Sequence, residues 1–283
     1  MRLPDWIKTH SRLNQHTTKH LLRRHGVSTV CEEARCPNRP ECFSKPTATF
    51  MILGSNCTRK CGFCSVKSGK PGTPDNNEPE NVAKAAQEMK LKYVVITSVT
   101  RDDLSDGGAG EFARTISAVR KKLPFAKIEV LTPDFSGDAG TLKIVLNSEP
   151  DVYNHNVETI ERLYPGVRPQ ADFRRSLYIL RMAKEIVPDI NTKSGFMLGL
   201  GEKHEEVIQL LADLRETGCD FVTIGQYLRP AKNNIPVVEY VAPDIFDDLQ
   251  IRANEMGFKY VASGPLVRSS MNAGEMYEKA HSS

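Results

Sequence analysis

The feature that most constrains this chain is a group of three cysteines within eight residues. They stand in Cys57-Thr-Arg-Lys-Cys61-Gly-Phe-Cys64, separated by three and then two residues, and we call them the second triad. Thiolates this close can face one point from a single loop, and they suit a soft-metal centre such as zinc or an iron–sulfur cube. A four-iron cube held by three cysteines leaves one iron open for chemistry. The spacing therefore predicts a metal centre with a free position.

A first triad precedes it, spaced four and then five residues apart and made of Cys31, Cys36 and Cys42. Two nearby prolines predict a stiff loop. Basic residues favour thiolates there, namely Arg35, Arg39 and Lys45. The alternatives for this triad are three unrelated thiols or a second zinc site. A structural zinc site normally needs four ligands, often as two closely spaced pairs, and no such pair accompanies the second triad.

Bulk properties narrow the class of protein. The chain has 283 residues, of which 40% are hydrophobic, which is enough for one large core. A formal net charge of +3 does not suggest a nucleic-acid binder, and no apolar run is long enough to cross a membrane. Seven cysteines without an expected secretory signal favour metal or redox use in a reducing compartment, so we predict a cytoplasmic location.

Residues 1–30 are locally basic. Six Lys or Arg residues stand there against one acid, and four histidines accompany them; the basic residues are Arg2, Lys8, Arg12, Lys19, Arg23 and Arg24. The stretch 9–25 predicts a short helix. This basic arm can either meet an acidic partner or be an ordinary solvated helix.

Hydrophobic patterning predicts an alternation of strands and helices. Strands are expected at 49–54, 93–99, 127–131, 151–156, 194–200, 221–228 and 260–262. Helices are expected at 81–90, 110–123, 141–147, 171–187, 203–217 and 243–256. Six βα units in series indicate an α/β fold with a partial (β/α)6 TIM-like barrel. The predicted domains are an N-terminal cluster-binding extension (1–46), the barrel (47–262) and a short C-terminal segment (263–283).

Ligands of parallel α/β barrels collect where the strands end. Polar groups follow five of the predicted strands, including Thr97, Ser98, Asn156 and Glu158. Singly these are weak signals, since Asp102 and Asp103 can cap a helix and His155 can be a packing residue. Cys219, just before a strand, is expected to be a buried core thiol.

The spacing of the second triad and its Gly-Phe insert resemble the signature of the radical S-adenosylmethionine (SAM) enzymes. Together with further segments, the chain resembles the lipoyl synthases over roughly residues 2–275. These segments are the first triad and the stretches 101–108, 154–159, 195–202 and 264–270. A departure from the family pattern is Met271, where a tyrosine is usual.

The resemblance implies two 4Fe-4S clusters. The second triad would hold the cluster that binds SAM and reduces it to a 5′-deoxyadenosyl radical. The first triad would hold an auxiliary cluster whose fourth ligand matches Ser270, with Ser269 the lesser choice. The second triad and Ser270 would thus be the catalytic groups. The stretch 154–156 is also similar to one in biotin synthase, and on that likeness Asn156 and Glu158 would hold the SAM ribose. Arg175 would meet the SAM carboxylate, although it can equally be a surface charge, and Thr97 and Ser98 are expected as further cofactor contacts.

The implied reaction inserts sulfur from the auxiliary cluster at C6 and C8 of an octanoyl-lysine chain. The implied partners are an octanoylated lipoyl carrier domain or H protein, an electron donor such as ferredoxin or flavodoxin, and an iron–sulfur carrier that rebuilds the cluster. Two alternatives stay open: a radical SAM sulfur-inserting enzyme with another substrate, similar to biotin synthase, and a non-catalytic zinc-binding module.

Overall fold

The computed structural model describes residues 2–7, 13–45 and 47–282. The chain forms two compact units. We call Thr9–Arg59 with Ser65–Tyr153 the N-terminal unit, and Met1–Lys8, Lys60–Cys64 and Asn154–Ser283 the C-terminal unit. Three basic or titratable residues of the predicted arm lie outside the described residues, together with the first part of the helix predicted over 9–25: Lys8, His10 and Arg12. Residues 13–15 are not helical, so the observed helix, α1, begins later than predicted, at His16.

The N-terminal unit contains strands in the order β1-β2-β5-β6-β7. Their bounds are β1 Ser28–Thr29, β2 Thr49–Ile52, β5 Tyr93–Ser98, β6 Lys127–Leu131 and β7 Val152–Asn154, whose last residue belongs to the other unit. β2, β5 and β6 run parallel, with Phe50 opposite Ile96, whereas the short β1 pairs antiparallel with β2. β3 (Asn56–Cys57) and β4 (Lys67–Ser68) form a separate parallel pair.

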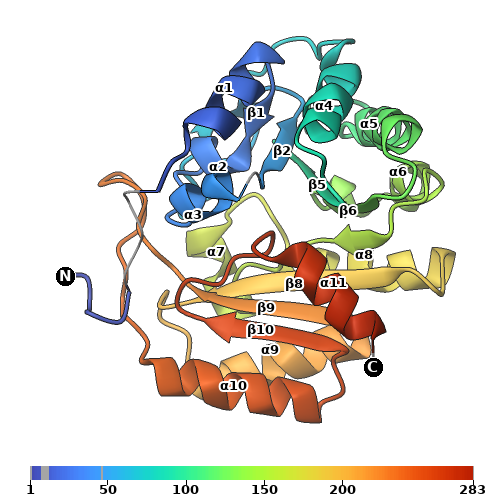
Figure 1. Ribbon diagram of the computed structural model, residues 1–283. Helices are drawn as coiled ribbons and strands as arrows, with labels where there is room; N and C mark the ends of the chain where they lie inside the picture. The colour runs from blue at the N-terminus through green and yellow to red at the C-terminus, as the bar shows by residue number, and fades with distance from the viewer. Residues whose placement is uncertain (1, 8–12, 46, 283) are drawn as a thin grey trace. The chain divides into compact units, whose positions relative to one another are not determined.

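Helices α4, α5 and α6 cover the outside of these parallel strands (Figure 1). The helices of this unit are α1 His16–Arg24, α2 Val30–Glu33, α3 Arg39–Ser44, α4 Glu78–Glu88, α5 Ala109–Lys122 and α6 Ala139–Leu146, with a 3-10 turn, η1, at Phe135–Gly137. α5 shows why these residues form a helix. Ile116 and Val119 share its buried face. Three basic residues in its last turn stabilise the helix, because their positive charge is attracted to the negative end of the helix dipole.

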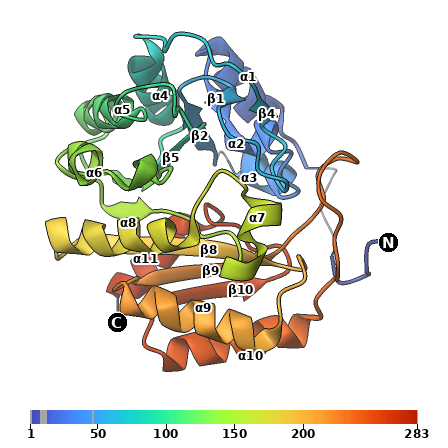
Figure 2. The ribbon, with the colours of Figure 1, turned by 180° about the vertical axis from the view of Figure 1, so that it is seen from behind.

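The C-terminal unit contains strands in the order β8-β9-β10, all parallel. They are β8 Asn191–Leu198, β9 Phe221–Gln226 and β10 Tyr260–Gly264. Its helices are α7 Tyr164–Val167, α8 Phe173–Ile186, α9 His204–Glu216, α10 Pro243–Glu255 and α11 Ala273–His281, with a 3-10 turn, η2, at Glu161–Leu163. α8 and α9 lie in front of these strands in Figure 2, whereas α11 lies in front of them in Figure 1. The strands are thus covered on both faces.

The predicted strands and long helices are present, and their bounds differ from the prediction by a few residues. The segment of the first triad is a correction, because it contains the short helices α2 and α3 where a stiff loop was expected. Pro40 lies in the first turn of α3. Proline is tolerated there, because the N–H groups of a first turn make no hydrogen bond within the helix. Helices α7 and α11 were also not predicted.

The prediction of a buried core thiol is confirmed. Cys219 is fully buried and its thiol lies 3.3 Å from the carbonyl oxygen of Phe221. Burial raises the pKa of Cys219 to about 12, so it stays a neutral core thiol. His155 is buried directly after β7, and its backbone N–H donates to the carbonyl of Lys193. No helix among the described residues has the length and apolar character that a membrane crossing requires.

Candidate active site

The first triad is assembled by local backbone contacts. Cys31 lies in α2 and Cys42 in α3, and Cys36 stands between these helices. The N–H of Cys36 donates to the carbonyl of Cys31 over 3.1 Å, and the N–H of Cys42 donates to the carbonyl of Asn38 over 3.0 Å. The Thr29 side chain caps α2 by accepting the N–H of Glu32. All three thiols are free. Local hydrogen bonds therefore fix the spacing of this triad.

The thiols of the first triad affect one another. Burial raises the pKa of Cys31 to about 12, a hydrogen bond from Thr49 opposes this, and Cys36 and Cys42 raise it further. Burial also raises the pKa of Cys42 to about 11, with a further increase from Cys36. Lys45 favours the Cys42 thiolate as predicted, but burial outweighs it. A metal that binds Cys31 and Cys42 would therefore have to displace their protons.

Among the described residues, no three His, Cys, Asp or Glu side chains are arranged to hold one metal ion. The cysteines of an iron–sulfur cube stand farther apart than the ligands of a single metal ion, because each cysteine binds its own iron atom.

The first half of the second triad belongs to the N-terminal unit. Cys57 ends β3, and its sulfur accepts the N–H of Thr100 over 3.3 Å and that of Arg59 over 3.4 Å. Hydrogen bonds from the backbone to a cysteine sulfur are one of the means by which proteins tune iron–sulfur clusters. The Thr58 hydroxyl lies 3.0 Å from both the carbonyl of Thr100 and a carboxylate oxygen of Asp102. The loop after β5 thus holds this half of the motif.

Arg59, between the first two cysteines of the motif, is a buried anchor. Its guanidinium binds Asp102 with contacts of 2.8 and 2.9 Å and Asp134 with contacts of 2.7 and 3.0 Å. The Arg59 side chain is 6% exposed and that of Asp134 is fully buried. Burial alone would lower the pKa of Arg59, but the two carboxylates outweigh it and raise the pKa above its usual range. The motif is therefore fastened to the ends of β5 and β6.

The second half of the motif, residues 60–64, belongs to the C-terminal unit. The Gly62 N–H donates to the carbonyl of Val167 over 2.8 Å, and its carbonyl accepts the N–H of Ile235 over 3.0 Å. The buried Asn234 side chain donates to the carbonyls of Gly62, over 3.1 Å, and Cys64, over 2.8 Å. A Cβ at position 62 would lie 2.8 Å from the Ile235 side chain, so only glycine permits this approach.

Phe63, the aromatic residue of the motif, packs on a buried cluster of Val167, Leu200 and Tyr227. Phe63 therefore anchors the turn between Cys61 and Cys64 by apolar burial, while Asn234 and Ile235 anchor it by hydrogen bonds.

Asn156 and Glu158 adjoin each other in the C-terminal unit. The Asn156 side-chain N–H donates to a Glu158 carboxylate oxygen over 3.1 Å. Burial raises the pKa of Glu158, and Arg168 partly offsets this. Glu158 has φ 66°, a left-handed conformation that its backbone bonds to β8 maintain: its N–H donates to Gly195 and its carbonyl accepts from Met197. Arg168 donates to the carbonyls of residues 156 and 157.

The remaining predicted cofactor contacts differ in their surroundings. In the N-terminal unit, Thr97 donates to the carbonyl of Leu131, whereas the buried Ser98 hydroxyl has no hydrogen-bond partner among the described residues. An unsatisfied buried hydroxyl at the end of a parallel strand fits a ligand contact. In the C-terminal unit, Arg175 is half-buried in the first turn of α8, where its N–H is capped by Asp172. The role predicted for Arg175 stays a prediction.

The two serines after β10 are distinct. Ser269 donates its hydroxyl to the Asn156 side-chain oxygen over 3.0 Å. The hydroxyl of Ser270 makes no hydrogen bond among the residues that the structure describes, and the N–H of Met271 donates to the carbonyl of Arg268 over 2.9 Å, forming a turn around it. Ser270 is therefore the serine with a hydroxyl left for a ligand.

Sequence reasoning missed three residues that position the motif, namely Arg59, Asp134 and Asn234. It also missed Arg168, which holds the backbone of residues 156 and 157. Only Arg59 carried a signal, its place between two cysteines. The helix-capping alternative for Asp102 and Asp103 is wrong. Asp102 pairs with Arg59 and Asp103 with Arg101, while Asp106 accepts the N–H groups at the start of α5.

Comparison with known proteins gives the class first. The model of the Radical SAM superfamily matches residues 51–225. Methylornithine synthase has a similar structure, with a TM-score of 0.58 and 16% identity over 88% of this chain and 82% of that one. This likeness concerns the fold, and with the superfamily match it confirms the predicted α/β partial (β/α)6 barrel.

Closer relatives give the family. A lipoyl synthase of Alkaliphilus metalliredigens is 53% identical over 98% of this chain and 97% of its own length. Lipoyl synthases of Caldicellulosiruptor bescii and Haemophilus influenzae are 55% and 52% identical over 96% of this chain, covering 94% and 87% of their own lengths. The chain therefore belongs to the lipoyl synthase family of radical SAM enzymes, as its motifs predicted.

Proposed function

We propose that this protein is a lipoyl synthase that inserts two sulfur atoms, at C6 and C8, into an octanoyl chain carried on a lysine of a partner protein. The observation that carries this proposal is the presence of two separate cysteine triads in a chain that is 53% identical to a lipoyl synthase over nearly its whole length. In this proposal the second triad holds the cluster that binds SAM, and the first triad holds the cluster that donates sulfur.

In this proposal the second triad holds a 4Fe-4S cluster whose open iron binds SAM. When bound, the cluster and SAM supply hydrogen-atom abstraction from unactivated C–H bonds, which acidic and basic side chains cannot perform. The protein's own part is positional. Arg59 and Asn234 fix the two halves of the motif, and Asn156 and Glu158 receive the SAM ribose. Arg175 meets the SAM carboxylate, and Thr97 and Ser98 add contacts from β5.

The first triad and Ser270 hold the auxiliary 4Fe-4S cluster that supplies sulfur. An oxygen ligand on iron is a poor match for a soft metal, so Ser270 releases its iron more readily than a thiolate would. The free hydroxyl of Ser270 supports its assignment as the ligand. Met271, in place of the usual tyrosine, lies beside this ligand and leaves the ligand itself intact.

The proposed domains separate the residues that hold the two clusters. Residues 1–46 are the extension with the first triad, and β1 within it adds an antiparallel strand to β2. Residues 47–262 are the radical SAM barrel. Residues 263–283 bring Ser270, although β10 itself continues to Gly264.

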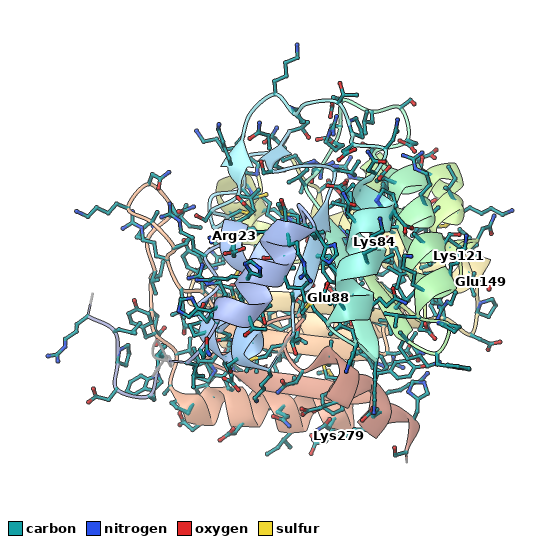
Figure 3. All side chains as sticks on the ribbon, turned by 45° about the horizontal axis from the view of Figure 1, so that its top comes forward. Arg23, Lys84, Glu88, Lys121, Glu149 and Lys279 are labelled. Atoms are coloured by element: carbon teal, nitrogen blue, oxygen red, sulfur yellow. The ribbon has the colours of Figure 1, made fainter. Side chains whose placement is uncertain are left out.

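The proposed partners are an octanoylated lipoyl carrier domain or H protein, ferredoxin or flavodoxin as reductant, and an iron–sulfur carrier for rebuilding the auxiliary cluster. The exposed basic residues of α1 support docking of an acidic carrier. Arg23 lies on the surface of this helix, and the neighbouring helix α4 carries Lys84 and Glu88 (Figure 3). No disulfide joins any of the seven cysteines, all of which are among the described residues, and this supports a reducing compartment, the cytoplasm.

The decisive experiment is anaerobic purification followed by quantitation of iron, sulfide and zinc, paired with mass spectrometry of an octanoyl-lysine peptide after incubation with SAM and reductant. We expect about eight iron and eight sulfide per chain, from two four-iron clusters, and a lipoyl product. About two zinc ions without sulfide would indicate the zinc-binding module instead. Full clusters and SAM cleavage without any octanoyl product would point to another sulfur acceptor.

A further inference from the structure

Three polar side chains of the C-terminal unit form a row that joins the serine segment to the proposed SAM contacts. The Ser269 hydroxyl donates to Asn156 Oδ1 over 3.0 Å, and Asn156 Nδ2 donates to Glu158 Oε1 over 3.1 Å. The Asn156 amide is thus held from both sides. If the Asn156 amide were flipped, its oxygen would face the Glu158 carboxylate and repel it. The hydrogen bonds therefore favour a single orientation of this amide.

The backbone of β8 makes room for this row. A Cβ at Gly195 would lie 2.4 Å from Thr223 Oγ1, 2.8 Å from Ser269 Oγ and 3.1 Å from Asn156 Oδ1. Only glycine leaves space for three polar groups to converge there. The hydroxyls of Thr223 and Ser269 are 3.5 Å apart, so Thr223 borders the Ser269 hydroxyl.

The next residue after this fixed hydroxyl is Ser270, the proposed iron ligand. A turn encloses both serines, since the N–H of Met271 donates to the carbonyl of Arg268 over 2.9 Å. A group that holds Asn156 and Glu158 in place therefore also holds the Ser269 hydroxyl, and through one peptide unit it restrains Ser270.

We infer that Ser269 is a positioning residue that couples SAM binding at Asn156 and Glu158 to the hold of Ser270 on the auxiliary iron. This inference rests on the proposed function, which assigns SAM to the first pair and iron to Ser270. With SAM bound, the row is ordered and Ser270 keeps its iron. When SAM leaves, Asn156 loosens and the iron is lost more easily. Because coupling between two sites is reciprocal, the serine segment also strengthens SAM binding.

The test uses the anaerobic holoenzyme with both clusters. An iron chelator is added with and without SAM, in the absence of reductant, and Mössbauer spectra follow the oxygen-ligated iron of the auxiliary cluster. In the unaltered protein we expect SAM to slow its loss by about fivefold, the scale of one net hydrogen bond. Ser269→Ala should abolish this protection and raise the Kd for SAM about fivefold.

Two variants complete the design. Ser269→Thr keeps a hydroxyl and should restore much of the protection. Ser263→Ala is the matched control, because Ser263 is a half-buried serine of β10 whose hydroxyl bonds elsewhere, to the carbonyl of Phe246. It should behave as the unaltered protein does. Should Ser269→Ala fail to retain its clusters, Ser269→Gly removes the same hydroxyl and is expected to give the same loss of protection.

Equal protection by SAM in the unaltered protein and in Ser269→Ala would overturn the inference, as would the absence of protection in the unaltered protein. Failure of the proposed function looks different. It would appear as an unaltered protein that lacks the oxygen-ligated iron or makes no lipoyl product, before any variant is compared.

Discussion

The two cysteine triads of this protein are built in different ways. The first is fixed by neighbours in sequence, through α2, α3 and the backbone bonds within residues 29–42. The second depends on distant partners. Arg59 reaches Asp134, 75 residues away, and Asn234 reaches Gly62, 172 residues away. The backbone of the first triad is therefore set mainly within its own segment, whereas that of the second triad depends on distant parts of the folded chain.

The largest expected contrast comes from the cysteines themselves. Cys61→Ala should reduce both SAM cleavage and lipoyl formation to background, because the cluster that serves SAM loses a ligand. Cys31→Ala should leave SAM cleavage and abolish sulfur insertion. 5′-Deoxyadenosine and lipoyl peptide, measured together by mass spectrometry, distinguish the two. Cys219→Ala controls for loss of a thiol as such. SAM cleavage by Cys61→Ala, or lipoyl product from Cys31→Ala, would contradict the assignment.

Arg59→Met should give the next largest effect. It leaves the fully buried Asp134 without its cation, and breaking such a pair typically costs about 3–5 kcal/mol. We expect urea unfolding at lower concentration and loss of iron from the second triad before the first. The neighbouring Lys60 is exposed, so Lys60→Met is the matched control. Iron lost equally from both triads would remove the distinction between them.

Asn234→Ala tests the other half of the motif more gently. Two carbonyls of the motif lose their donor, which costs about 1–3 kcal/mol in the free energy of unfolding. We expect weaker retention of the SAM-binding cluster, seen as a faster chelator reaction, with the auxiliary cluster unchanged. Asn233→Ala, at the exposed neighbouring position, should have no effect. An unchanged cluster in Asn234→Ala would show that Phe63 packing suffices.

The smallest expected effect concerns one ion-paired aspartate in each of the two units. Burial would raise the pKa of Asp220, but Lys184, Lys259 and the N–H of Thr192 lower it below its usual value. Asp151, before β7, has a pKa lowered in the same manner by Lys127 and Arg120. A depressed carboxyl pKa stabilises the fold above about pH 4, the usual value for aspartate, and this stability is lost as the pH falls.

Asp220→Asn and Asp151→Asn should therefore each lower the melting temperature at pH 7, and the difference from the unaltered protein should shrink as the pH falls below about 4. Thermal unfolding of the cluster-free protein at a series of pH values measures this. A difference that grows on acidification would reverse the sign and contradict the ion-pair explanation.

The sequence predicted what depends on local pattern. Alternating strands and helices, the buried Cys219 and both triads are visible because periodicity and ligand spacing are local. It could not predict α3, since Pro-Asn-Arg-Pro is typical of a loop while Pro40 fits a first helical turn. Nor could it predict Asp134 or Asn234 as anchors, because an isolated Asp or Asn carries no mark of a partner more than seventy residues away.

One shared acceptor has a consequence for observing this enzyme. The Gly62 carbonyl accepts both the Asn234 side chain and the Ile235 amide, at 3.1 and 3.0 Å. Deuterium uptake at the Ile235 amide therefore depends on whether the cysteine turn is held in place. Hydrogen–deuterium exchange at this amide should report how firmly the turn that carries Cys61 and Cys64 is held, in the intact protein and without any added label.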